Sequence, residues 1–221
     1  RSAIYRIIRW SQLTGKIRND GWGVGIRQKL NGGEDTIRVV PQKEDETPLN
    51  SKLPYAVVKN VSEAYLRTFK QMYGINYTIF RFFNTYGPSQ SKDFVITKFI
   101  IQSLKGENLI INGDGSQTRT FCYIDDSIDT QINCMNNNLF INDVLNIGNE
   151  YEITILDLAK LVLKLTSSNV KIIHKDPLKD GDMTRRKPDI SKMKKVLNRE
   201  LISLEDGITT VYKYFKQLNS I

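Results

Sequence analysis

From about residue 38 onward, short β-branched runs alternate with longer amphipathic segments, and this alternation limits the possible folds more than any other feature. Strands alternating with helices are typical of α/β architecture, in which helices cover a mostly parallel sheet. The predicted strands cover the ranges 76–82, 109–111, 119–124, 144–147 and 170–173. The predicted helices cover 54–73, 94–105, 126–136, 155–165, 190–197 and 204–218.

Several predicted helices have recognisable first residues. Pro54 suits the first turn of a helix, because the amide hydrogen it lacks would have no partner there. Thr154 with Asp157, and Ser203 with Asp206, have the spacing of N-caps that are supported from the third helical position. These pairs predict helix starts near residues 155 and 204.

The first 37 residues differ from the rest of the chain and form an atypical basic segment. Of the net charge of +8, the range 1–38 contributes +5, from eight Lys and Arg against three acidic residues. No zinc-finger, RNP or recognition-helix pattern accompanies this charge, so we expect no nucleic-acid partner. A small molecule that contains a diphosphate explains the positive charge more simply.

The glycines at 21, 23 and 25 do not form a dinucleotide-binding turn. Such a turn needs its glycines between a strand and a helix, and Ile26 stands where the pattern G-x-G-x-x-G requires the third glycine. The stretch is interpreted as a turn or hairpin.

Cysteine and histidine usage favours a reduced compartment and no metal. The chain has two cysteines, Cys122 and Cys134, and no long uncharged apolar run, which is typical of a cytoplasmic protein without a membrane segment. Both thiols are expected to be partly buried. His174, the single histidine, has no neighbours with metal-ligand or triad spacing and is expected to be structural or solvated.

Tyr55 and Lys59 are candidates for acid–base chemistry. They lie one helical turn apart, so that a phenol and an ammonium can share one face, where the cation favours the phenolate. This spacing is weak support by itself, and Tyr212 with Lys216 repeats it on a helix that is expected to pack Tyr212 against the protein body.

Three further motifs follow the first pair in a fixed order: Arg81-x-x-Asn84-x-Tyr86-Gly87-Pro88, Gly113-Asp-Gly-x-x-x-Arg119 and Arg186-Lys-Pro-Asp189. With Tyr55-x-x-x-Lys59, they make residues 38–221 resemble the extended short-chain dehydrogenase/reductase family, specifically its NAD-dependent nucleotide-sugar epimerases, dehydratases and decarboxylases. The resemblance implies the carboxy-terminal part of a Rossmann-type doubly wound parallel sheet, a smaller α/β substrate-binding domain and a homodimer.

The resemblance also implies roles for individual residues. Tyr55 would take the proton from a sugar hydroxyl while hydride passes to NAD, and Lys59 would favour the phenolate and hold the nicotinamide ribose. An unperturbed phenol, with a pKa near ~10, is a poor base at neutral pH without such help. Phe82, at the end of its predicted strand, would also contact the cofactor. The alternative for Tyr55 is an aromatic side chain packed under a loop.

The substrate residues implied by the resemblance lie later in the chain. Asn84 would contact the diphosphate of a UDP-sugar or other nucleotide sugar, although its sequence context also suits a turn. Arg119 would pair with the nucleotide, and otherwise would be a solvated residue at a strand end. Asp182, Arg185 and Arg186 would close over ribose and phosphates, or would belong to a basic surface loop.

The chain departs from the family pattern before position 38, where no glycine-rich turn precedes Tyr55. We therefore expect an amino-terminally truncated sequence or one joined to unrelated residues near position 37. The predicted division is the atypical segment 1–37, the remainder of the NAD domain over 38–88, and a mainly substrate-binding part over 89–221 with some elements returning to the Rossmann sheet.

The motifs look most like those of UDP-glucuronate decarboxylases, in which oxidation at C4 makes the neighbouring carboxylate labile. The short loop 89–94 lacks an arginine for a uronate carboxylate, so 4-epimerisation and 4,6-dehydration stay open. An alternative of a different class is a non-catalytic protein that binds a nucleotide sugar or a partner subunit through Asn84, Arg119 and Arg185.

Overall fold

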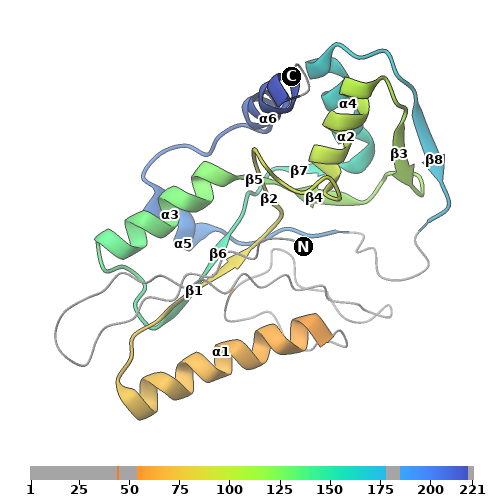
Figure 1. The fold of residues 1–221 in the computed structure, drawn as a ribbon. Helices are drawn as coiled ribbons and strands as arrows, with labels where there is room; N and C mark the ends of the chain where they lie inside the picture. Colours follow the sequence, from red (N-terminus) through yellow and green to blue (C-terminus); the bar gives the residue numbers. More distant parts are fainter. Residues whose placement is uncertain (1–43, 45–53, 178–184, 219–221) are drawn as a thin grey trace.

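The computed structural model describes residue 44 and the ranges 54–177 and 185–218. The segment 1–37, with its glycine-rich stretch, lies outside the described residues, and so does Asp182. Figure 1 shows the order of the elements along the chain. The helices are α1 (Pro54–Tyr73), α2 (Val95–Lys105), α3 (Ile124–Asn136), α4 (Ile155–Thr166), α5 (Ser191–Leu197) and α6 (Leu204–Leu218). The strands are β1 (Thr78–Phe82), β2 (Thr85–Tyr86), β3 (Leu109–Asn112), β4 (Thr118–Thr120), β5 (Cys122–Tyr123), β6 (Asp143–Ile147), β7 (Glu152–Thr154) and β8 (Ile172–Lys175).

The strands pair two by two, and most of the pairs are parallel. In the described ranges, β1 with β6, β2 with β5 and β3 with β8 are parallel, whereas β4 with β7 is antiparallel. The parallel pairs join strands that are far apart in sequence, with helices in the connections, as an α/β fold requires. The predicted fold class is confirmed at this level.

The predicted strand over 119–124 is wrong in its extent. The chain forms β4, leaves the ladder at Phe121 and forms β5, because the two short strands pair with different partners, β7 and β2. Ile124 then already belongs to α3. The predicted strand over 170–173 lies two residues later, at β8, and β7 was not predicted.

Two helix starts were predicted correctly. The Thr154 hydroxyl accepts a hydrogen bond from the Asp157 amide at 3.0 Å, and its proton goes to the Asp157 carboxylate at 2.7 Å. Ser203 and Asp206 repeat this arrangement at the start of α6, at 3.1 and 2.6 Å. Each cap satisfies an amide that the helix itself leaves without a partner.

The sheet of β1 and β6 separates two packed layers. Phe80, Leu145 and Ile147 pack with α3 and α5 on one face. On the other face, Tyr77, Ile79 and Val144 form a small cluster with Leu66 of α1. Figure 1 accordingly shows α1 on one side of these strands and α3 and α5 on the other. The alternation of faces along each strand fixes this division.

The largest apolar cluster lies around α2, α4 and α6. It includes Phe99, Leu158 and Ile208, all nearly or fully buried. Gly207 permits a close approach here, since a Cβ at this position would collide with the Tyr86 ring. Tyr86 belongs to the motif that follows β1, so this cluster supports the loop that carries Asn84. The proposed division at residue 88 remains a prediction.

Candidate nucleotide-sugar site

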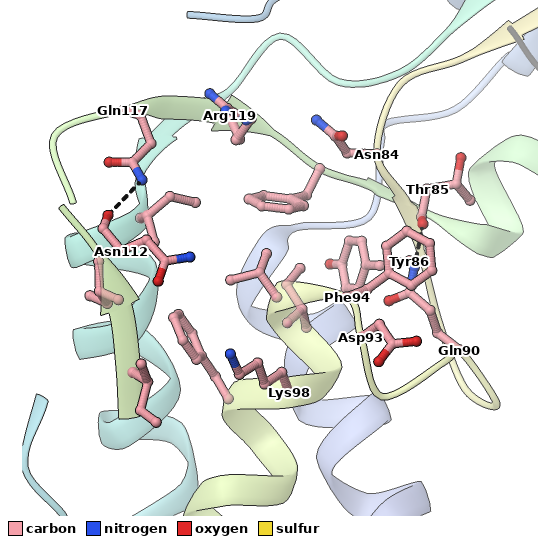
Figure 2. Close-up of a pocket in the computed structure, with 17 residues that line it drawn as sticks. Asn84, Thr85, Tyr86, Gln90, Asp93, Phe94, Lys98, Asn112, Gln117 and Arg119 are labelled. Atoms are coloured by element: carbon pink, nitrogen blue, oxygen red, sulfur yellow. Dashed lines mark hydrogen bonds between the residues drawn. The ribbon is translucent and has the colours of Figure 1, made fainter. Parts of the chain in front are cut away.

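A pocket of about 470 Å³ opens between the loop after β1, the start of α2 and the strands β3 and β4. This volume is within the range of small-molecule sites. Figure 2 shows Asn84 and Arg119 along one edge and Lys98 across from them. Its polar lining residues are Asn84, Thr85, Gln90, Asp93, Lys98, Asn112, Gln117 and Arg119.

Asn84 is held at the edge of the pocket by its backbone conformation and by its amide. Its φ of 45° is left-handed, a region that asparagine tolerates better than most residues. Its Nδ2 donates to the Thr120 carbonyl at 2.8 Å, and its own carbonyl accepts from the Cys122 amide at 3.3 Å. The structure thereby joins the Asn84 loop to the segment that carries Arg119.

Arg119 lies in β4, opposite Ile153 of β7. Its Nη1 donates to the Thr118 carbonyl at 2.6 Å, and its side chain lines the pocket. A guanidinium presents several donors in one plane, which suits phosphate oxygens. The structure therefore brings Asn84, predicted to contact the diphosphate, and Arg119, predicted to contact the nucleotide, to one cavity.

Arg185 and Arg186 contact the same region from the carboxy-terminal side. Arg185 forms a two-point ion pair with Glu152 of β7, both bonds being 2.7 Å long. These hydrogen bonds lower the pKa of Glu152 to about 2. Arg186 is buried, with its guanidinium 5.0 Å from the centre of the Phe83 ring. Arg186 thereby contacts the residue before Asn84, and Arg185 contacts the residue opposite Thr120 of β4, but neither arginine lines the pocket itself.

The predicted catalytic pair lies on α1. Tyr55 occupies the second position of the helix, and its side chain lies outside the described part of the structure. Lys59 is buried, with 6% of its surface exposed. The Phe82 side chain packs into the cluster on the opposite face of the sheet from α1, so its predicted cofactor contact would come from its backbone.

Burial disfavours ionisation of two other groups at or beside the pocket. It raises the pKa of the buried Cys122 thiol to about 12 and raises the pKa of the Tyr86 phenol as well. Both cysteines are free, and both are buried more completely than the partial burial that was predicted. His174 lies within β8, with its Nδ1 2.8 Å from the Gly113 carbonyl. Among the described residues, no group of His, Cys, Asp and Glu is arranged to hold a metal ion.

Sequence reasoning did not identify several polar residues of this region. Lys98 and Asn112 line the pocket outside every motif, and Gln117 lines it from within the Gly113–Arg119 motif, where it was given no role. Glu63 was also missed, and it forms a buried ion pair with Arg81 of β1. The available signal for Glu63 was its position one turn after Lys59.

A family model described as the NAD dependent epimerase/dehydratase family matches residues 32–148, which is more than half of the chain. The chain belongs to this family. NAD is therefore the family's cofactor, and the family's nucleotide-sugar enzymes are the proper comparison for the pocket.

One curated relative is UDP-glucuronic acid decarboxylase 3 of Arabidopsis thaliana, which is 37% identical over 76% of this chain and 49% of its own length. The solved UDP-glucose 4-epimerase of Thermotoga maritima has a TM-score of 0.80 and 32% identity, over 89% of this chain and 63% of that one. A Bacillus cereus UDP-glucuronic acid 4-epimerase, solved with UDP-glucuronic acid and NAD, has a TM-score of 0.78 and 30% identity, over 91% and 63%.

These neighbours are Rossmann-type epimerases, which confirms the predicted fold class. The chain spans about half the length of the curated relatives that it matches. Within the described ranges, no helix has both the length and the apolar character needed to cross a membrane.

Proposed function

We propose that this chain carries the nucleotide-sugar site and the base-bearing helix of an NAD-dependent enzyme that oxidises a UDP-sugar at C4. The observation that carries the proposal is the pocket that Asn84 and Arg119 share. An amide just past the carboxyl end of β1 and a guanidinium on β4 form a suitable environment for a diphosphate. The asparagine conformation and the strand pairing hold both groups in place before any ligand binds.

The residues of α1 fit the chemistry that the cofactor requires. Lys59 is a buried cation on the side of the helix that faces β1, so it can hold ribose hydroxyls and favour an ionised phenol at position 55. NAD, when bound, supplies the hydride acceptor. Tyr55 would remove the hydroxyl proton at C4, and Lys59 would stabilise the resulting charge. Phe82, Asp182, Arg185 and Arg186 complete the proposed contacts.

The step after C4 oxidation is decarboxylation or epimerisation of a UDP-uronate in our proposal, because both activities appear in the names of the relatives. In the loop 89–94, the Ser89 hydroxyl shares a hydrogen bond with the Tyr214 hydroxyl of α6 at 2.6 Å. Lys92 belongs to this loop and Lys98 follows it in α2, so the loop and the first turn of α2 carry lysines and no arginine. Incubation with UDP-glucuronate and NAD distinguishes the outcomes, since decarboxylation releases CO₂ and epimerisation conserves mass.

Calorimetry with UDP-glucuronate and NAD in separate titrations tests the binding part of the proposal. Arg119→Met should weaken nucleotide-sugar binding by about tenfold or more, because a charge-assisted contact to phosphate is lost. Lys105→Met is the control, since this lysine is more than half exposed at the far end of α2 and does not line the pocket. Unchanged affinity in the Arg119 variant would reject the pocket.

The same titrations address the alternative function. Binding of UDP-glucuronate without binding of NAD would favour a protein that binds nucleotide sugars without turnover. A homodimer is also part of our proposal, and sedimentation at several concentrations tests it. The cytoplasmic location remains a prediction from the two free thiols.

A further inference from the structure

Helix α1 turns its polar side inward and its apolar side outward. Lys59 is 6% exposed and Glu63 is fully buried on the side toward β1. Val58, Tyr65 and Met72, on the other side, are 61, 62 and 63% exposed. Hydrophobic burial within a single chain would favour the reverse orientation, because an amphipathic helix normally places its apolar stripe on the core.

An ion pair holds the inward face in place. Arg81 of β1 donates from Nε to one Glu63 oxygen at 2.9 Å and from Nη2 to the other at 3.0 Å. Arg81 itself is 4% exposed. Two parallel bonds between planar groups define an angle as well as a distance, so they restrict rotation of the helix about its axis.

Further hydrogen bonds connect the Glu63–Arg81 pair to the segment around Asp189. Arg81 also donates from Nη1 to the Glu44 carbonyl at 2.9 Å, and the Glu44 carboxylate accepts from the backbone N–H of Asn146 at 2.7 Å. Asn146 lies beside Arg81 in the sheet, and its Nδ2 donates to the Asp189 carbonyl at 3.1 Å. The contacts therefore run from α1 to the segment that follows Arg186.

We infer that Glu63 and Arg81 are positioning residues that select which face of α1 turns toward the sheet and thereby place Tyr55 and Lys59 for reaction. Positions 55, 59 and 63 are spaced by four residues, so orienting Glu63 orients the other two positions. The inference rests on the proposed function for the roles of Tyr55 and Lys59. The orientation itself is a property of the chain without ligands.

The alternative is that the pair only contributes stability, and the chemistry of buried pairs separates the two roles. Replacing both partners of a buried ion pair by apolar residues often leaves stability unchanged or higher. The double variant Glu63→Leu/Arg81→Met should therefore stay folded. It should also lose the orientation of α1, since an apolar side chain at position 63 makes no directional bonds that distinguish one rotation of the helix from another.

The test measures the rate of amine methylation at Lys59 and of nitration at Tyr65, peptide by peptide, in the full 221-residue chain. In the unaltered chain, Lys59 should react about tenfold more slowly than the exposed Lys160. In Glu63→Gln and in the double variant, Lys59 should approach the Lys160 rate while Tyr65 slows several-fold. Opposite changes on opposite faces identify rotation, whereas fraying of the helix would accelerate both.

Asp126→Asn is the matched control, because Asp126 is a fully buried carboxylate paired with Arg199 at 2.6 Å in a different part of the fold. It should destabilise the chain and leave both rates unchanged. The inference is overturned if Lys59 and Tyr65 accelerate together, if neither changes, or if Asp126→Asn reproduces the effect. It is also overturned if the double variant does not fold, or if Lys59 already reacts like Lys160 in the unaltered chain.

No step of this test needs NAD or a nucleotide sugar. A chain that binds neither ligand but shows the opposite changes would reject the proposed function and keep the orienting role. A chain that binds both ligands and shows no change in the two rates would support the proposed function and reject the orienting role.

Discussion

Helices α1 and α4 are both amphipathic, but they lie in opposite orientations toward the core. α4 buries Leu158, Ala159 and Val162 in the largest apolar cluster. α1 buries Lys59 and Glu63 and leaves Tyr65 and Phe69 exposed. The two helices show that an apolar stripe determines the orientation of a helix only where no stronger directional contact opposes it.

The difference follows from the nature of the forces. Apolar burial is proportional to area and has little directionality, so it positions α4 through the sum of many contacts. A two-point ion pair in a buried site is directional, and breaking it leaves an uncompensated charge that is costly to bury. One such pair can therefore oppose the preference of a whole apolar stripe.

The largest expected effect lies on α4. Leu158→Ala should reduce the free energy of unfolding by about 2–5 kcal/mol, because it removes buried methyl groups and leaves a cavity. Tyr65→Ala on α1 should change it by no more than about 0.5 kcal/mol, since this side chain is largely exposed. Urea denaturation measures both. A large loss in the Tyr65 variant would show that the outer face of α1 is covered in solution.

The caps of α4 and α6 should have a smaller effect. Thr154→Ala and Ser203→Ala should each cost about 1 kcal/mol, because the first turn of the helix loses a hydrogen-bond acceptor. Equal losses measured by urea denaturation would show that both helices depend on their own sequence at these ends. Thr154→Ser retains the hydroxyl and should restore most of the stability. A Thr154→Ala variant as stable as the unaltered chain would contradict the capping role.

The Glu152 pair should contribute to stability in a pH-dependent way. The pKa of the Glu152 carboxyl group is about 2 in the folded chain and 4.5 in the unperturbed group. The contribution of the pair to stability is therefore complete above pH about 4.5 and is lost as the pH falls toward about 2. The difference in urea midpoint between the chain and Glu152→Gln should therefore shrink between pH about 6 and about 3. A difference that stays constant over this range would show that the pair does not form in solution.

A small effect is also expected at the pair that orients α1. Glu63→Leu/Arg81→Met should change the free energy of unfolding by less than about 1 kcal/mol in either direction, because the lost attraction and the avoided desolvation largely offset each other. Differential scanning calorimetry measures this change. A loss as large as that of Leu158→Ala would mean that α1 and α4 are held by interactions of similar strength.

The local features of the fold were predictable from sequence because their causes are local. Pro54 begins α1, and Thr154 caps α4 through a contact three residues away. The split of the predicted strand at Phe121 was not predictable, because it depends on two partner strands distant in sequence. The polar lining of the pocket was predicted only in part, since Lys98 and Asn112 belong to no motif.

The order of the motifs, without any structure, made the chain resemble a family whose site would use Tyr55, Lys59, Asn84 and Arg119. The structure brings Asn84 and Arg119 to one pocket. Only the tertiary structure decided that α1 turns its polar face inward. Glu63 and Arg81 are separated by 18 positions, and their bonds form only when the helix packs on the strand. Local sequence determines where the helices and strands form, whereas the ion pair between α1 and β1 determines which face of α1 turns toward the sheet.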